Sequence, residues 1–358
     1  MKTFIPFHEL NDREAIIVDG AHVSGLVLSH WKGQNNIHEI EDDTSAAIVL
    51  NALKHHDKFQ FERYRFVTAT HFDIDGLIGI WAVDHVPCAL QHEELLKAIG
   101  RIGDFREFRF YSETDRQALK IVCWIDEEEQ QRFYPPFGEE QEMKACTDKF
   151  AWFLPRLEDV ILNTEQYRSI WEAKYNRVMK EAEHAYSAGA KKYDDCGLTV
   201  FRAEEPLHYY AYFGLSEGTD IVLTMYKENR YELEYKYTTW VDIASRKVYP
   251  RISMQPLCDY LNSIEKSGLR WYCDSISDTG PILRLENSEL AKAERFADPF
   301  KRKIYSSSID PVTFESLIVS YFEFNFQKHP KRYKPTWHEM RSIQPAMNFS
   351  GNEPEQTP

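Results

Sequence analysis

The chain has 358 residues, 43% of them hydrophobic and 28% charged, which is enough for about two domains with a well-buried core. Its formal net charge of -14 would repel a polyanion, so extended nucleic acid and anionic membranes are excluded as partners and a small substrate is favoured. The sequence shows no C-x-x-C pair, no leader-like start and no long uncharged apolar run. We therefore expect a soluble cytoplasmic protein with reduced thiols.

The first 150 residues alternate short apolar strands with helical stretches. Ala15 to Val18 and Arg65 to Thr70 are typical of buried strands, and Thr44 to Leu53 is typical of a helix capped by Thr44 or Ser45. Further helices are expected at Leu77 to His85 and Ala89 to Ile99. This alternation predicts a mainly parallel sheet flanked by helices, in which ligands bind beyond the carboxyl ends of the strands.

The pattern changes after a long amphipathic helix, which is expected from Pro155 to about Tyr186. Asp220 to Tyr226 and Tyr231 to Trp240 alternate apolar and polar residues on either side of Glu228-Asn229-Arg230, which predicts an antiparallel hairpin. A helix, two strands and a final helix are then expected at Gln255 to Lys266, Leu269 to Cys273, Pro281 to Leu285 and Pro311 to Phe326.

These elements predict an α/β protein with a second α+β domain that contains the hairpin. The expected parts are an α/β domain at 1–150, a connecting helix at 151–190, an α+β domain with a C-terminal helix at 191–349, and a polar disordered tail at 350–358.

The sequence Thr70-His71-Phe72-Asp73-Ile74-Asp75-Gly76 places an imidazole and two carboxylates at alternate positions after an apolar run. Alternate side chains of an extended segment share a face, so His71, Asp73 and Asp75 can converge. Crowded ionisable groups of this kind are costly without a cation. Their oxygen and imidazole ligands favour Mn²⁺, with Mg²⁺ or Fe²⁺ as alternatives. We predict that these three residues are both metal ligands and catalytic residues.

Further site residues are expected at other strand ends and in the helical region that follows. Asp19 and His22, after the first buried strand, and the later Asp104 are predicted metal ligands. The predicted substrate-binding residues are His92, Arg246 and Arg251. Each has a competing structural interpretation: a turn or strand end for the aspartates, a packed or surface position for the histidines, and solvated charges for the arginines.

The acidic turn also resembles a known motif. His71 to Gly76, followed by Leu77-Ile78-Gly79, is similar to the first motif of the DHH phosphoesterases, in which a D-x-D-G turn carries metal ligands and opens a helix. Ile16 to His22 resembles a D-H-H strand end, although Gly20 and Ala21 stand where two histidines are expected. Glu41 to Ala47 is similar to the helix start that follows D-H-H. Because the motifs occur in reversed order, the resemblance implies a permuted DHH-like fold.

The chain as a whole resembles an uncharacterised bacterial family of unknown function. The resemblance lies in T-H-F-D-I-D-G-L, in Gly103-Asp104-Phe105 and in the tract from Trp240 to Arg251. It spans most of the chain and implies no activity.

Three functions follow from these patterns. The first is a metal-dependent hydrolase of a small phosphate ester or nucleotide, in which two ions about 4 Å apart activate a water molecule. The second is a non-catalytic DHH-like protein that binds a ligand or a partner, because Gly20 and Ala21 replace histidines. The third is a phosphatase similar to the haloacid dehalogenases, with Asp73 as nucleophile, although Leu77 replaces the threonine expected there. The sequence predicts no oligomeric state.

Overall fold

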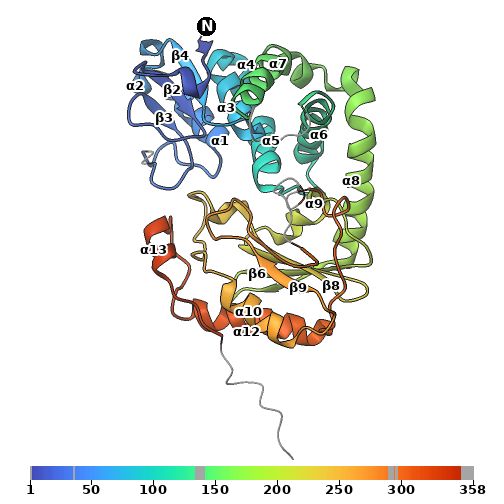
Figure 1. The fold of residues 1–358 in the computed structure, drawn as a ribbon. Helices are drawn as coiled ribbons and strands as arrows, with labels where there is room; N and C mark the ends of the chain where they lie inside the picture. Colours follow the sequence, from blue (N-terminus) through green and yellow to red (C-terminus); the bar gives the residue numbers. More distant parts are fainter. Residues whose placement is uncertain (1, 35–36, 134–141, 289–293, 295–296, 348–358) are drawn as a thin grey trace, which may run out of the picture. The chain divides into compact units, whose positions relative to one another are not determined.

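A computed structural model of the chain describes residues 2–34, 37–133, 142–288, 294 and 297–347. It divides into two compact units (Figure 1). The first unit contains Met1–Ser187, His208–Leu215 and Val241–Ser245, and the second contains Ala188–Leu207, Ser216–Trp240 and Arg246–Pro358. The domain boundary expected at residue 150 falls inside a helix of the first unit, and the expected tail at 350–358 lies outside the described residues.

The first unit is built on a parallel sheet with the strand order β1-β4-β2-β3. Its strands are Thr3–Phe4 (β1), Ala15–Val18 (β2), Leu26–Leu28 (β3) and Phe66–Ala69 (β4). The expected parallel sheet is therefore confirmed. Strand β3 follows β2 after a short loop, in which Gly25 has a φ of 89° and approaches the backbone of Ala15 too closely for a side chain.

Helices make up most of the rest of the first unit. They are α1 (Ser45–Leu53), α2 (His56–Phe59), α3 (Ile74–Asp84), α4 (Val86–Gln91), α5 (Glu93–Phe105), α6 (Glu113–Phe133), α7 (Glu142–Leu162), α8 (Arg168–Ala188) and α9 (Tyr209–Tyr212). Short 3-10 helices lie at Phe7–Glu9 (η1), Phe61–Arg63 (η2), Thr164–Tyr167 (η4) and Phe213–Ser216 (η5).

Both faces of the first sheet are covered. On one face α3 packs closely on β2, because a Cβ on Gly79 would lie 2.6 Å from Cγ1 of Val18. On the other face Ile17 joins an apolar cluster with Ile5 and Leu10 of the N-terminal segment. Neighbouring side chains of a strand point to opposite faces, so Ile17 and Val18 pack on opposite faces of the sheet. Burial on both faces is typical of parallel sheets.

Two helices differ from the sequence prediction. The stretch expected as one helix at Ala89 to Ile99 is divided between α4 and α5 at His92. The single helix expected from Pro155 to Tyr186 is also wrong, because the chain turns at η4 between α7 and α8. The Thr164 hydroxyl donates to the Val160 carbonyl at 2.8 Å, and such a bond competes with the regular helical bonds.

The second unit contains a mixed sheet with the order β5-β6-β7-β8-β10-β9. Its strands are Ala190–Tyr193 (β5), Leu198–Ala203 (β6), Ile221–Tyr226 (β7), Arg230–Tyr235 (β8), Arg270–Cys273 (β9) and Ile282–Glu286 (β10). Strands β6 and β7 are parallel and the other pairs are antiparallel. The expected hairpin is β7 and β8, and its turn residues Glu228 and Asn229 have positive φ angles of 62° and 56°.

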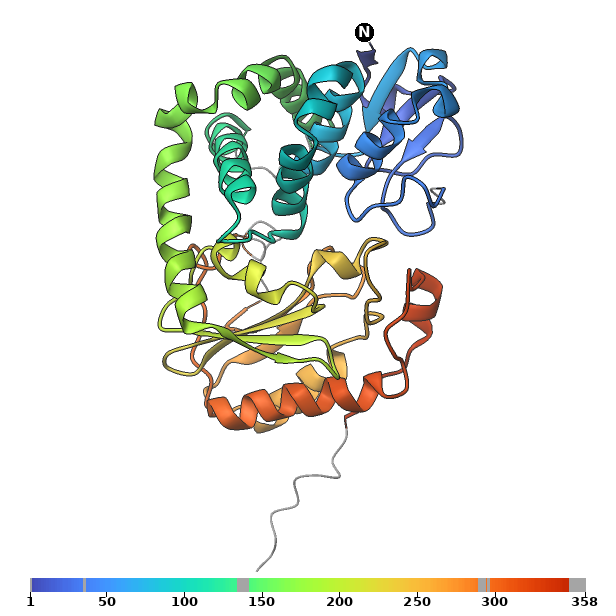
Figure 2. The same ribbon diagram turned by 180° about the vertical axis from the view of Figure 1, so that it is seen from behind.

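Aromatic stacking packs α12 (Pro311–Phe326) of the second unit against its sheet and against the segment that contains Tyr249. The other described helices of this unit are α10 (Gln255–Ile264), α13 (Trp337–Ser342) and the short η6 (Tyr237–Thr239). Phe314 of α12 stacks on Tyr231 of β8 with ring centroids 4.2 Å apart, and Phe326 stacks on Tyr249 at the same separation. Figure 2 shows α12 running alongside the sheet.

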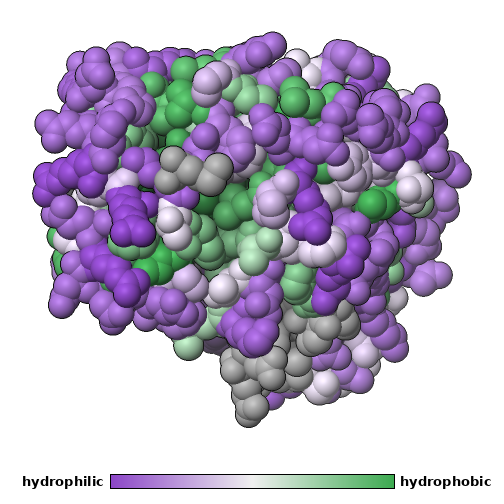
Figure 3. Space-filling model, turned by 90° about the horizontal axis from the view of Figure 1, so that it is seen from above, coloured by the Kyte–Doolittle hydropathy of each residue, from purple (hydrophilic) through white to green (hydrophobic). Residues whose placement is uncertain are grey.

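One face of the molecule is strongly polar. The face in Figure 3 is covered mainly by hydrophilic residues, with hydrophobic residues in smaller patches between them. In the part of the chain that the structure describes, no helix has both the length and the apolar character needed to span a bilayer.

Candidate metal centre

Three neighbouring strands of the first sheet end at one site. Asp19 directly follows β2, and His71 and His30 follow β4 and β3 after one intervening residue each. Because β2 lies between β4 and β3, Asp19 lies between the two histidines. Its Oδ1 is 3.2 Å from Nε2 of His30, and its Oδ2 is 3.5 Å from Nε2 of His71. Asp19 also has a left-handed backbone, with a φ of 48°, which is uncommon for a residue other than glycine.

The start of α3 supplies two more carboxylates. Asp73 is the N-cap, and its Oδ1 accepts a hydrogen bond from the Gly76 amide at 2.7 Å. Its Oδ2 lies 3.0 Å from Nε2 of His71. Asp75 accepts hydrogen bonds from the Ser45 and Ala46 amides at the start of α1, at 2.6 and 3.0 Å. The two aspartates of the D-x-D-G motif therefore also cap the N-termini of two different helices.

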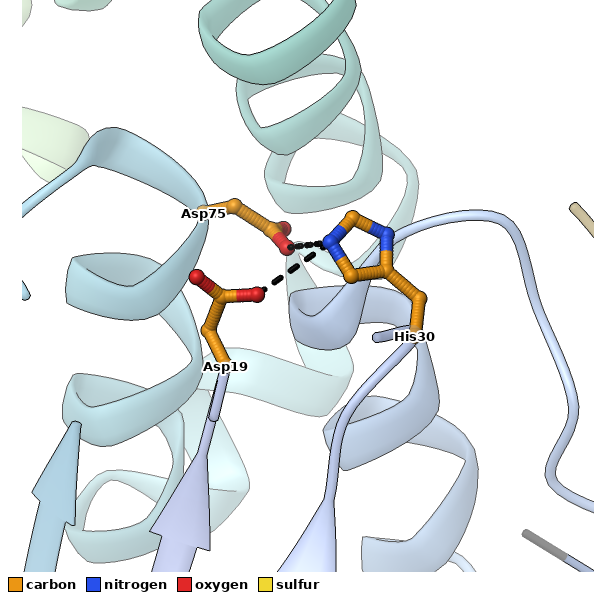
Figure 4. Close-up of side chains that lie close together, drawn as sticks. All are labelled: Asp19, His30 and Asp75. Carbon is orange, nitrogen blue, oxygen red and sulfur yellow. Dashed lines mark ion pairs between the residues drawn. The ribbon is translucent and has the colours of Figure 1, made fainter. Parts of the chain in front are cut away.

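These side chains form two groups that share one residue. Asp19, His30 and Asp75 have ligand atoms within 4.8 Å of one another, and so do Asp19, His71 and Asp73. Figure 4 shows the first group, with Asp19 and Asp75 both turned toward the imidazole of His30. Carboxylate oxygens and imidazole nitrogens are suitable ligands for Mn²⁺, Mg²⁺ or Fe²⁺. Oδ1 of Asp19 faces the His30 group and also accepts hydrogen bonds from the Ser45 hydroxyl and the Trp31 indole, whereas Oδ2 faces the His71 group.

Asp104 is a third carboxylate beside His30. Its Oδ2 lies 3.8 Å from Nε2 of His30, and among the described residues this buried atom has no hydrogen-bond partner. Helix α5 brings it close through two glycines, because a Cβ on Gly100 would lie 2.8 Å from Oδ1 of Asp75 and one on Gly103 would lie 2.5 Å from Cβ of Ile74. A buried carboxylate oxygen without a partner is costly, and a bound ion would explain it.

The acidic surroundings change the ionisation of the buried groups. Burial alone would lower the pKa of His30, but its hydrogen bond to Asp19 and the charges of Asp104, Asp19 and Asp75 outweigh burial and raise it to about 10. Burial, with smaller contributions from neighbouring carboxylates, raises the pKa values of Asp75 and Asp104 above their ordinary range. The site thus holds more acidic groups than its two histidines can balance.

A backbone carbonyl fixes the orientation of His30. Its Nδ1 lies 2.7 Å from the carbonyl oxygen of Asp43, which can only accept, so Nδ1 carries a hydrogen and donates it. Nε2 is consequently the nitrogen that faces the carboxylates. Histidine ligands of metals usually donate their second ring N–H in this way.

The two groups differ in exposure. The side chains of Asp19, His30 and Asp75 are at most 2% exposed, whereas His71 is 44% and Asp73 27% exposed. The indole of Trp31 borders the exposed group, with its ring centroid 5.7 Å from that of His71. The site therefore has a buried side at His30 and an open side at His71.

The structure places the other predicted site residues elsewhere. His22 bonds locally to Ser24, and among the described residues it belongs to neither group. His92 occupies the N-cap position of α5 without a side-chain capping bond, whereas Asp104 lies at the opposite end of this 13-residue helix.

The two predicted arginines belong to the second unit. Arg246 pairs with Asp220, with Nη1 and Oδ1 2.6 Å apart. Arg251 is fully buried and donates to the Thr239 hydroxyl and to the carbonyls of Lys236, Ile276, Asp278 and Thr279. These bonds take up all five N–H groups of the guanidinium, which is typical of a structural arginine.

The sequence analysis missed His30, and it missed the side chains that hold Asp19. The Ser45 hydroxyl donates to Oδ1 of Asp19 at 2.8 Å, and the Trp31 indole donates to the same atom at 3.1 Å. The available signal was the short apolar run Leu26-Val27-Leu28 before Ser29-His30, which marks another strand end.

The fold and the site define an α/β protein with clustered carboxylates and histidines at the carboxyl ends of a parallel sheet. The profile of DUF6687, a family of unknown function, matches residues 1–333, so the chain belongs to this family. No curated protein and no solved structure matches the chain.

Proposed function

We propose that the protein is a metal-dependent hydrolase of a small phosphate ester or nucleotide. The observation that carries the proposal is the position of Asp19, which is shared by two groups of potential ligands. Mn²⁺ fits the mixture of carboxylate and imidazole best, with Mg²⁺ or Fe²⁺ as alternatives. When bound, such ions would lower the pKa of a water molecule and stabilise negative charge on phosphate oxygens.

The helix caps do not prevent the aspartates from binding a metal. Each carboxylate oxygen has two lone pairs, so an oxygen that accepts one backbone N–H keeps a second position for an ion. In Asp73 the cap uses Oδ1, whereas Oδ2 faces His71. The caps hold the two carboxylates in fixed directions, as expected of preorganised ligands.

The unequal exposure suggests how a substrate would approach. The side chains of His30, Asp75 and Asp104 are at most 6% exposed, so a phosphate group would enter from the side of His71 and Asp73. The Trp31 indole beside His71 would form one wall of that entrance. On this proposal no side chain has to attack phosphorus, and the chain's residues hold the ions and position the phosphate.

The alternative with Asp73 as nucleophile has less support. In that mechanism the second aspartate of the motif exchanges a proton with the substrate. Asp75 is fully buried, and both of its oxygens accept backbone hydrogen bonds at the start of α1. The resemblance of the acidic turn to the DHH phosphoesterases favours the metal-dependent hydrolase instead.

Metal analysis combined with one substitution tests the proposal. The protein is purified without chelator, its Mn, Fe and Mg contents are measured, and phosphomonoesters, phosphodiesters and nucleotides are assayed with added Mn²⁺. Asp19→Asn should lose the metal and lower turnover by about a thousandfold or more, because both groups lose a ligand. Asp57→Asn, an exposed change on α2, is the matched control.

Metal binding without turnover would instead support the non-catalytic alternative, a ligand- or partner-binding protein. A metal-free protein whose activity survives Asp19→Asn would exclude the proposal.

A further inference from the structure

A segment from the second half of the chain belongs to the first unit. Val241–Ser245 lies in that unit, although the residues on either side belong to the second unit. We call this segment the strap. The Asp242 amide donates to the His30 carbonyl at 2.7 Å, and Val241 forms an antiparallel bridge with Trp31. The strap therefore runs along the loop that carries His30.

A buried lysine reinforces this pairing. Nζ of Lys32 donates to the Val241 carbonyl at 2.8 Å and lies 3.4 Å from Oδ1 of Asp242. The Lys32 side chain is only 2% exposed, and Asp242 of the strap is an ion-pair partner of its charge. The Gly33 amide adds a hydrogen bond to Oδ2 of Asp242 at 3.3 Å.

Asp43 joins the strap to the imidazole of His30. Its carboxylate accepts hydrogen bonds from the Ala244 amide at 2.9 Å, the Ser245 amide at 2.8 Å and the Ser245 hydroxyl at 2.6 Å. Its backbone carbonyl accepts the hydrogen of His30 Nδ1. The side chain of Asp43 is thus fixed by the strap while its backbone fixes the ring.

We propose that Asp43 is a positioning residue and that, through it, the strap sets the metal affinity of the buried group. This inference rests on the proposed function, since it requires an ion at Nε2 of His30. The outer partner of a histidine ligand orients its ring, and the loss of such a partner typically weakens metal binding by about 10- to 100-fold. His71 and Asp73 are positioned by β4 and α3 instead, so the effect should be confined to one of two ions.

Mn²⁺ titration of the full-length protein by calorimetry tests this inference. The wild type should bind two ions, and Asp43→Ala should weaken one of them by about tenfold without changing the other. Ser245→Ala, an exposed change that removes a single hydrogen bond, should weaken the same ion by a smaller factor of about three.

The neighbouring carboxylate provides a matched control. Asp42 bonds to Lys97 and Asn51 rather than to the strap, and its Oδ1 accepts the Asp43 amide at 2.8 Å. Asparagine keeps an oxygen acceptor for that amide, so Asp42→Asn should leave both affinities unchanged. NMR of the ion-free protein gives a second readout, because the ring N–H signal of His30 should shift toward solvent-exposed values in Asp43→Ala. A purely structural role of Asp43 would lower the melting temperature and change both affinities equally.

The failures of the two proposals can be distinguished. If the wild type binds no Mn²⁺, both the proposed function and the role of the strap are wrong. If the wild type binds two ions and Asp43→Ala retains both affinities, only the role of the strap is wrong. Should Asp43→Ala fail to fold, unchanged Mn²⁺ binding by Ser245→Ala would overturn the inference by itself.

Discussion

Each unit buries a set of charged side chains, and the two sets differ in how their charges are balanced. In the second unit Arg302 pairs with Glu232 through contacts of 2.8 Å, and Arg284 pairs with Asp274 at 3.1 Å. In the first unit four aspartates surround two histidines, and a buried oxygen of one of them, Asp104, has no hydrogen-bond partner within the described ranges. Nε of Arg284 also lacks a hydrogen bond among the described residues, but it lies 3.4 Å from Oε1 of Glu286. On the proposed function, a metal ion would neutralise the excess of carboxylates in the first unit.

The largest expected effect comes from breaking a balanced pair. Asp274→Ala should lower the free energy of unfolding by about 3 kcal/mol, because it removes the shorter ion pair of buried Arg284, leaving the 3.4 Å pair with Glu286, and also removes the acceptor of the Ile282 amide. Urea unfolding followed by circular dichroism measures the change. Mn²⁺ binding per folded molecule should remain unchanged, and a weaker ion affinity in this variant would undermine the distinction between the two sets.

A smaller effect is expected from displacing one carboxylate of the unbalanced set. A Cβ at position 100 would lie 2.8 Å from Oδ1 of Asp75, so Gly100→Ala should push this oxygen out of place. We expect the affinity for one Mn²⁺ ion to fall about tenfold, or about 1.4 kcal/mol. Alanine is also the better helix former, so helix content should not decrease. An unchanged affinity in calorimetry would show that Asp75 is not a ligand.

Glu265 provides a pH test in the second unit. Burial alone would raise its pKa, but hydrogen bonds from the Ser307 and Ser308 hydroxyls and from nearby amides outweigh burial and hold it at about 2. A lowered pKa stabilises the fold above the unfolded value near 4.5, and this contribution is lost as the pH falls toward 2.

Glu265→Gln should therefore cost on the order of 1 kcal/mol at pH 7, allowing for solvent screening, and almost nothing near pH 2. Urea midpoints of both proteins between pH 2 and 7 measure the difference. Parallel curves across this range would contradict the assignment.

The smallest change in stability is expected at Asp104. Asp104→Asn removes one of the crowded acidic groups and allows an amide to donate to a neighbouring carboxylate. The ion-free protein should therefore be equally stable, or more stable by up to about 1 kcal/mol. Thermal unfolding with and without Mn²⁺ should show that the ion stabilises this variant less than the wild type. Marked destabilisation without a change in the Mn²⁺ effect would make Asp104 a structural residue.

Local patterns predicted the frame of both units well. The strand Ala15–Val18, the cap at Thr44 and the hairpin of β7 and β8 depend on neighbouring residues, so the sequence reveals them directly. The division of the expected helix from Pro155 to Tyr186 depends on a side-chain bond at Thr164, which periodicity does not detect.

One short motif supplied three side chains of the site, but their predicted convergence on one point differs from the structure, in which Asp75 groups with His30, and Asp73 with His71. His71, Asp73 and Asp75 lie within five positions, and Asp19 follows a clear strand. His30 was missed because β3 has only three residues and its position beside β2 depends on a loop with a close glycine contact. The order of strands in a sheet is a long-range property, and it decides which strand ends are neighbours.

The left-handed backbone of Asp19 limits how this position can be redesigned. Asparagine and glycine tolerate that conformation, whereas alanine or valine would add about 1 kcal/mol of strain or more at the end of the central strand β2. Of the residues suited to the bend, only aspartate also carries a charge. A variant intended to abolish metal binding while keeping the backbone conformation should therefore introduce asparagine at this position.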